Sequence, residues 1–99
     1  MTEKIDIKDY RITDQDILVD LRDRTVFNFG TIPGAVNIPV DEIDKLYLLP
    51  QSKRIVLFCQ KGEISSDIAD LLDENGFKTA ELLGGYREYL KNNMLLQID

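Results

Sequence analysis

Short apolar runs bounded by glycine, proline or charged residues predict the strands of this chain. They occupy residues 4–7, 17–19, 35–38, 54–58 and 78–83. The run at 54–58 is apolar on both faces, which is typical of a strand buried within a parallel sheet. The run at 4–7 instead alternates isoleucine with charged residues. The pattern therefore predicts four or five strands.

Between these runs the apolar spacing becomes helical. Ile43, Leu46 and Tyr47 lie three and four positions apart, with Asp41 placed as an N-cap and Pro50 placed to end the helix. A second pattern of this kind follows the glycine pair at 84–85, at Tyr86, Tyr89 and Leu90. Two polar stretches, residues 9–16 and the tail after residue 92, are expected to lie outside the regular elements.

The clearest helical stripe follows the run at 54–58. Its apolar members are Ile64, Ile68, Leu71 and Leu72. The charged residues expected on its outer side are Asp67, Asp70 and Glu74. Gly76, after Asn75, is placed to cap this helix in a left-handed conformation. Strands that alternate with short helices predict a parallel α/β sheet wound by right-handed crossovers.

Composition and charge narrow the class of protein. The 99 residues fit a single domain, 1–99, and 43% hydrophobic with 30% charged residues is typical of a globular chain. The net charge of −6 argues against general binding to nucleic acids or anionic membranes, which requires a basic face. The apolar runs are too short to cross a bilayer, and the N-terminus lacks the apolar core of a secretory signal.

Cysteine and histidine usage constrains the chemistry. Cys59 is the only cysteine, so no intrachain disulfide can form, and we expect a reducing, cytoplasmic location. The chain has no histidine, so its chemistry must proceed without imidazole as a general base or metal ligand.

One edge of the predicted sheet gathers the candidate site. Asp20, Cys59 and the pair Gly84–Gly85 each follow a predicted strand, and ligands of such sheets bind at the carboxyl ends of the strands. The segment after Cys59 enters a helix, where backbone N–H groups and the helix dipole favour an anion. A thiolate would be stabilised there, with Lys61 adding a positive charge. The segment reads Cys59, Gln60, Lys61, Gly62, Glu63, Ile64 and Ser65.

Each of these residues also has a purely structural interpretation. A lone cysteine at the end of a buried strand is often an inert small hydrophobe, and position alone favours neither alternative. Asp20 and Arg22 are better explained as a structural ion pair than as catalytic groups, and Gly84–Gly85 as a tight turn. Periodicity leaves open whether the aromatic residues form a rim around the cysteine or belong to the core; they are Phe27, Phe29 and Tyr86.

Between residues 17 and 90 the chain resembles a single-domain rhodanese. The matching segments are Val19-Asp20-Leu21-Arg22, residues 30–39 (GTIPGAVNIP), residues 58–65 (FCQKGEIS), Asn75-Gly76-Phe77 and Leu83-Gly84-Gly85-Tyr86. The resemblance implies a three-layer α/β/α fold around a mainly parallel five-stranded sheet. It implies that Cys59 carries a sulfane sulfur as a persulfide, with Gln60 to Ser65 forming the substrate-binding loop and no metal or organic cofactor.

The implied partners are sulfur donors and acceptors. The donor would be a small sulfane compound or a protein persulfide, from a desulfurase for example. The acceptor would be cyanide, a thiol, or a thioredoxin-like or glutathione-like reductant. No nucleic-acid or membrane partner is expected.

The sequence departs from the family pattern at several positions. Ile64 stands where the loop arginine is common, and Glu63 adds a carboxylate beside it. Thr31 replaces a common histidine, Val26 a common glutamate and Tyr89 a common tryptophan. Without an arginine fork, a small dianion such as thiosulfate is a weaker candidate donor than a protein-bound persulfide.

Two other functions are alternatives, the first of them suggested by these departures. One is a rhodanese-fold binding or regulatory module in which the cysteine has lost its role. The other is a cysteine phosphatase or arsenate reductase, which shares a thiolate loop but needs an arginine near it. The chain has no arginine between Arg54 and Arg87, so this second alternative is the weaker one.

Overall fold

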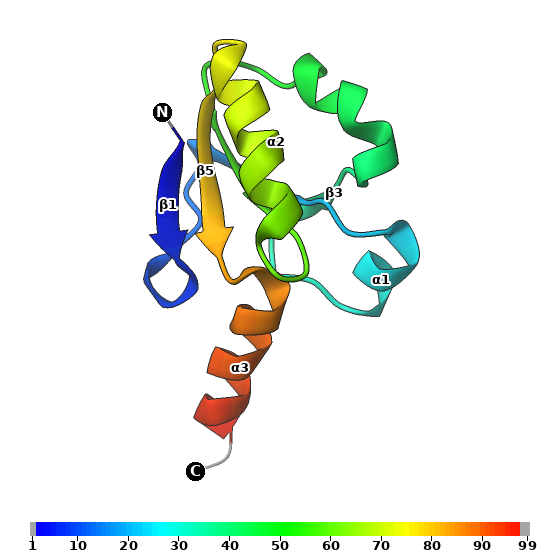
Figure 1. Cartoon of the computed structure of the whole chain (residues 1–99). Coiled ribbons are helices and arrows are strands. Elements are labelled where there is room, and N and C mark those ends of the chain that lie inside the picture. Colours follow the sequence, from blue (N-terminus) through cyan, green and yellow to red (C-terminus); the bar gives the residue numbers. More distant parts are fainter. Residues whose placement is uncertain (1, 98–99) are drawn as a thin grey trace.

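The computed structural model describes residues 2–97 and contains one five-stranded sheet (Figure 1). The strands lie in the order β1–β5–β4–β2–β3, and every neighbouring pair is parallel. Along the chain the elements are β1 (Glu3–Asp6), η1 (Ile7–Asp9), β2 (Asp16–Asp20), α1 (Arg24–Phe29), β3 (Val36–Asn37), η2 (Val40–Leu48), β4 (Arg54–Phe58), α2 (Glu63–Glu74), β5 (Lys78–Leu83) and α3 (Gly85–Gln97), where η marks a 3₁₀-helix. The strand with the strongest apolar run, β4, is therefore the central one.

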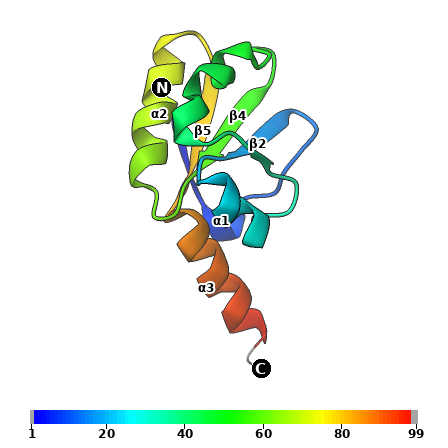
Figure 2. The same cartoon turned by 90° about the vertical axis from the view of Figure 1, so that its right-hand side faces the viewer.

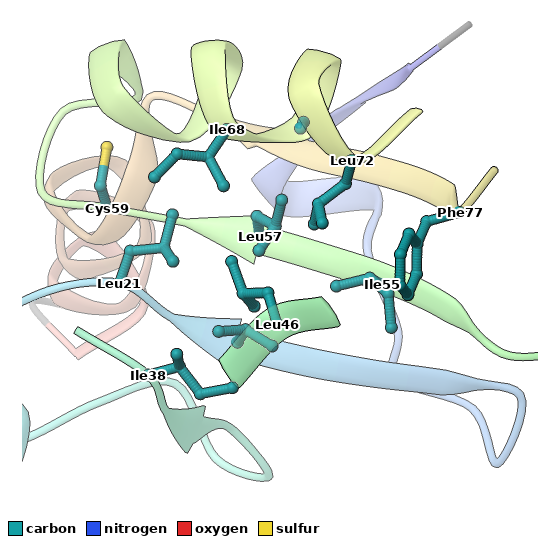
Figure 3. Packing of buried hydrophobic residues seen from close by; sticks show 11 residues of the cluster. Leu21, Ile38, Leu46, Ile55, Leu57, Cys59, Ile68, Leu72 and Phe77 are labelled. Carbon is teal, nitrogen blue, oxygen red and sulfur yellow. The ribbon is translucent and has the colours of Figure 1, made fainter. Parts of the chain in front are cut away.

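Each face of the sheet carries its own apolar cluster. Alternation along the central strand sends Ile55, Leu57 and Cys59 to one face and Val56 and Phe58 to the other. The first face is covered by α2 and η2, whose side chains complete the cluster drawn in Figure 3. The second face is covered by η1, the segment 30–35 and the start of α3, which then extends beyond the sheet (Figure 2). The expected layering of helices on both sides of a parallel sheet is confirmed.

The strands lie where the sequence predicted them, but the helices differ in three places. The short helix α1 was not predicted; it has only six residues, and none of them is buried. Asp41 does not cap the helix near it: η2 begins at Val40, with Pro39 at the N-cap and no side-chain cap bond. The tail after residue 92 was expected to be irregular, yet α3 continues through Gln97.

The buried stripe of α2 also differs from the predicted one. Ile64 and Leu71 were expected to face the core, but they are 49% and 41% exposed. The buried residues of the helix are Ser65, Ile68, Ala69 and Leu72. Two small residues thus replace two large ones on the inner face, which lets the helix lie close to the sheet. This one-residue displacement turns Ile64 out of the core.

The end of α2 follows the predicted left-handed cap. Gly76 has φ +91°, and its amide donates to the carbonyl of Asp73 at 3.2 Å. The amide of Phe77 donates to the carbonyl of Leu72, also at 3.2 Å. These two bonds satisfy carbonyls that the helix end would leave unpaired, and Phe77 packs in the same cluster as Leu72.

A cluster of charges ties the start of β2 to its neighbour β4 and, through β4, to the edge strand β1. The Asp16 side chain is 2% exposed and accepts hydrogen bonds from Arg54 Nε at 2.9 Å and from the Tyr10 hydroxyl at 3.0 Å. Arg54 also donates to Glu3 of the edge strand at 2.9 Å. Burial by itself raises the pKa of Asp16, but the hydrogen bonds from Arg54 and Tyr10 outweigh burial and hold that pKa below its ordinary value.

Among residues 2–97, none of the helices combines the length and the apolar character that crossing a membrane requires.

The Asp16 carboxylate should make the fold sensitive to acid. The pKa of Asp16 is lower in the folded protein than its ordinary value of 3.8. The ionised carboxylate therefore stabilises the fold at pH values above 3.8, and this stabilisation is lost as the pH falls through the pKa of the folded state. We expect Asp16→Asn to lower the free energy of unfolding at neutral pH by about 2 kcal/mol, because Arg54 loses a buried partner. As the pH falls below 3.8, the free energy of unfolding of the wild type should decrease more steeply than that of the variant. Urea unfolding across pH tests this, and parallel acid dependence of the two proteins would contradict it.

Candidate functional site

Cys59 lies immediately after the central strand, at its carboxyl end. Its side chain is 6% exposed and closes one end of the apolar cluster between the sheet and α2 (Figure 3). The residues before it are held by pairing with β2 and β5 on both sides. The chain then turns through residues 60–62 into α2. The sulfur therefore sits just past the end of the central strand, at the entry to a helix.

Two backbone amides of this loop donate to the sulfur. The N–H of Gly62 lies 3.2 Å from Cys59 Sγ, and the N–H of Ser65 lies 3.4 Å from it. The thiol itself donates to Ser65 Oγ at 3.5 Å. Gly62 is the N-cap of α2 and has φ +93°, a conformation that glycine adopts without strain. The arrangement offers a sulfur anion two fixed donors and the positive end of a helix.

The turn at Gly84–Gly85 holds this loop in place. The amide of Tyr86 donates to the Cys59 carbonyl at 2.8 Å, and that of Arg87 donates to the Gln60 carbonyl at 3.0 Å. A Cβ on Gly85 would lie 2.3 Å from the Cys59 carbonyl oxygen, so no larger residue fits without movement. The glycine pair is thus more than a tight turn: it permits two backbone segments to touch.

Asp20 and Arg22 form the expected ion pair, at the carboxyl end of β2. Arg22 Nη2 donates to Asp20 Oδ2 at 2.7 Å and to the carbonyl of Gly30 at 2.7 Å. Its guanidinium also lies over the ring of Tyr86, 3.8 Å from the centroid. Thr31 adds a hydrogen bond to Asp20 Oδ2 at 2.7 Å. The pair therefore fixes β2, the segment after α1 and the start of α3 around the cysteine.

A mainly apolar hollow of about 370 Å³ opens beside Cys59. Its lining combines four apolar side chains with a few polar ones: Leu21, Val26, Val40, Ile64, Arg22, Asp23 and Gln60. A smaller hollow of about 130 Å³ reaches the cysteine from the loop side, between Gln60, Lys61, Glu63 and Ile64. Ile64 lines both hollows, so the residue at the arginine position faces the site and not the core.

An exposed aromatic ring stands near this opening. Phe29 is 90% exposed and lines a third hollow with Arg22, Gln60 and Tyr86. Phe27 is half-buried, and Tyr86 packs on the second apolar cluster while also facing the hollow. Phe29 and Tyr86 therefore line a neighbouring hollow that Cys59 itself does not line, and Tyr86 also packs against the core.

The loop residues named from the sequence divide by role. Gly62 and Ser65 contact the sulfur; Gln60, Lys61, Glu63 and Ile64 line the adjoining hollows. Sequence reasoning missed Glu81, a buried carboxylate that accepts a hydrogen bond from Ser65 Oγ at 3.3 Å. A carboxylate in the middle of the strand run at 78–83 was the signal that could have found it. Within the described part of the chain, no group of three or more Cys, Asp or Glu residues is placed to hold a metal ion.

Replacing Gly85 with alanine should disrupt the loop that holds Cys59. We expect Gly85→Ala to lower the free energy of unfolding by about 3 kcal/mol, because the new methyl collides with a backbone carbonyl at a positive φ. Gly76→Ala is the matched control: its φ is also positive, but its Cβ would meet only Gln51 at 3.5 Å. That control should cost about 1 kcal/mol. Urea unfolding compares them, and equal losses would argue against the backbone contact.

The chain is similar in sequence to several known sulfurtransferases. The chain is 38% identical over 69 residues to the putative sulfurtransferase YtwF of Bacillus subtilis, which covers 69% of this chain and 67% of that protein. It is 34% identical over 90 residues to thiosulfate:glutathione sulfurtransferase of Homo sapiens, with 75% and 78% covered. A tRNA sulfurtransferase of Desulfurococcus amylolyticus is 32% identical over 78 residues, but this chain spans only 16% of its length.

The fold itself has close structural counterparts. A rhodanese-related protein from Thermoplasma volcanium superposes with a TM-score of 0.83 at 24% identity, covering 91% of this chain and 92% of that one. The family model of the rhodanese-like domain matches residues 5–92. Since that match spans nearly the whole chain, and its fold and relatives agree with it, this protein belongs to the rhodanese-like domain family.

Proposed function

We propose that the protein is a sulfurtransferase that carries sulfane sulfur as a persulfide on Cys59. The observation that carries the proposal is the pair of amides, from Gly62 and Ser65, that donate to the sulfur at the N-terminus of α2. Such donors stabilise negative charge on a thiolate and on a persulfide alike, so no general base has to remain beside the sulfur. The sulfurtransferase names of the relatives support the same activity.

The proposed transfer has two displacement steps without net oxidation. The Cys59 thiolate attacks the outer sulfur of a donor persulfide, R–S–SH; a new S–S bond forms, the donor S–S bond breaks, and its electron pair leaves with R–S⁻. An acceptor thiolate then attacks the outer sulfur of the Cys59 persulfide. A new S–S bond joins the outer sulfur to the acceptor, while the S–S bond to Cys59 breaks and its electron pair returns to the Cys59 sulfur. The leaving sulfur of that step is the one that the two amides hold.

The lining of the hollow supports a donor with an apolar or protein-borne group. Ile64 replaces a cation at the mouth, and the opening is walled by Val26 and Val40. A dianion would find no arginine fork on this loop, and Glu63 lies beside it. An apolar thiosulfonate or a persulfide on a partner protein fits these walls better. We propose a thiol as acceptor, either glutathione, as in the name of the human relative, or a thioredoxin-like thiol.

Sulfur loading should be visible on the intact protein. Incubation with a persulfide or thiosulfonate donor is expected to add the mass of one sulfur atom to the wild type. Cys59→Ser should gain nothing, because the chain has no other cysteine. Intact-mass spectrometry, with added thiol to remove the sulfur again, measures both. A wild type that stays unmodified by every donor class would favour the binding-module alternative.

The residue at position 64 should set the preference for the donor. Ile64→Arg is expected to raise kcat/KM for thiosulfate by about tenfold relative to an apolar thiosulfonate, because it restores a cation that can bind the dianion. Leu71→Arg is the matched control, since Leu71 lies on the same helix, is similarly exposed and lines none of the hollows around Cys59. Steady-state kinetics with both donors give the ratio of kcat/KM for thiosulfate to kcat/KM for the thiosulfonate. An unchanged ratio in Ile64→Arg would contradict the role of residue 64 in donor preference.

A further inference from the structure

A buried carboxylate lies behind the cysteine loop and has no part in the transfer steps above. Glu81 is in the middle of β5 and is 2% exposed. It points to the face that α2 covers, while its neighbours Ala80 and Leu82 pack in the cluster on the other face. Burying a carboxylate is strongly unfavourable unless it is paired, and a buried ion pair is seldom the most stable choice for such a position. The charge therefore calls for an explanation beyond packing.

Hydrogen bonds connect this carboxylate to the reactive sulfur. Glu81 Oε2 accepts from the Ser65 hydroxyl at 3.3 Å, and Ser65 Oγ in turn accepts from the Cys59 thiol at 3.5 Å. On its other side, Glu81 Oε1 accepts from Lys4 Nζ at 2.7 Å. Lys4 is the register partner of Glu81 on the edge strand β1. A continuous chain thus runs from an exposed lysine through a buried carboxylate and a hydroxyl to the sulfur.

We propose that Glu81 is a positioning residue that acts on Cys59 through Ser65, and that Lys4 is the counter-charge that limits its effect. The carboxylate holds the Ser65 hydroxyl proton, so a lone pair of Ser65 Oγ faces the sulfur and favours the protonated thiol. The two loop amides act on the same sulfur in the opposite direction. The balance between them sets how readily Cys59 ionises. This matters for sulfur transfer only if Cys59 is the reactive thiol of the proposed function.

The influence of Glu81 on Cys59 is electrostatic and orientational, since a charge one hydroxyl away from the sulfur acts through a poorly screened interior.

Other charged groups also lie around Glu81 and Cys59. Lys4 remains protonated, because the hydrogen bond to Glu81 and the negative charge of Glu81 raise the pKa of Lys4. Asp70 of α2 acts on Lys4 in the same direction. The other charged groups around Cys59 line its hollows: Arg22, Asp23, Lys61 and Glu63. Glu81 is the carboxylate that reaches the sulfur through a single hydroxyl.

The test is the pH profile of Cys59 alkylation by iodoacetamide, measured on the full chain without any sulfur donor. Glu81→Gln removes the charge but keeps an acceptor for Ser65, so its profile should move to lower pH. At mildly acidic pH it should alkylate about fivefold faster than the wild type. Lys4→Met leaves the carboxylate uncompensated and should move the profile the other way, with alkylation about fivefold slower.

Thr79→Val is the matched control for strand β5. Thr79 is also buried, lies two residues before Glu81 on the same face, and bonds to Thr2 of the edge strand without any charge. Its profile should coincide with that of the wild type. Shifts of opposite sign in the two charge variants support the proposal, because lost packing alone would not reverse sign. Coinciding profiles, or shifts in the same direction, would overturn it.

Stability and sulfur loading separate the remaining cases. Should Glu81→Gln unfold, Lys4→Met still decides, because Lys4 is 55% exposed on an edge strand; slower alkylation supports the proposal and an unchanged rate overturns it. Opposite shifts in a protein whose Cys59 takes up no sulfur would leave the positioning role intact and refute the proposed function. Normal loading with coinciding profiles would refute the positioning role alone.

Discussion

The contact between two backbone segments, the loop after Cys59 and the turn at Gly84–Gly85, underlies the whole site. The amides of Tyr86 and Arg87, directly after the turn, donate to the carbonyls of Cys59 and Gln60, while the amides of Gly62 and Ser65 donate to the sulfur. The approach is close enough that a single methyl on Gly85 would meet a carbonyl oxygen. Because neighbouring parallel strands end at the same edge, β4 and β5 bring these segments together. The sheet thus orients the sulfur before any substrate binds.

Around this contact, opposing influences act on one sulfur atom. The amides of Gly62 and Ser65 favour its anion, whereas the carboxylate of Glu81 favours the thiol through the Ser65 hydroxyl. An imidazole would normally mediate such a balance, but the chain has no histidine. The geometry achieves it with backbone dipoles and a buried carboxylate that is paired with an exposed lysine. At the mouth, an apolar wall with Ile64 replaces the guanidinium that a small dianion would need.

The position of Cys59 could be predicted, because an apolar run, a cysteine and a helix start follow one another within a few residues. The orientation of Ile64 could not. Along α2, one helical stripe begins at Ile64 and another, one residue later, begins at Ser65. The second stripe is the buried one, but it contains Ser65 and Ala69, which a pattern of large apolar residues does not reveal. Helix α1 was missed for a related reason, since none of its residues is buried. The contact between Ser65 and Glu81 joins residues from different elements, which periodicity cannot relate.

By itself, the sequence determined the parallel α/β class, the order of the strands along the chain and the candidate nucleophile, since these follow from local spacing and from the lone cysteine. The tertiary structure decided which amides reach the sulfur, which face of α2 is buried, and that a glutamate lies behind the loop. The physical reason is that hydrophobic patterning specifies which side of an element is buried only to within a residue. Hydrogen bonds between distant segments depend on how the elements pack.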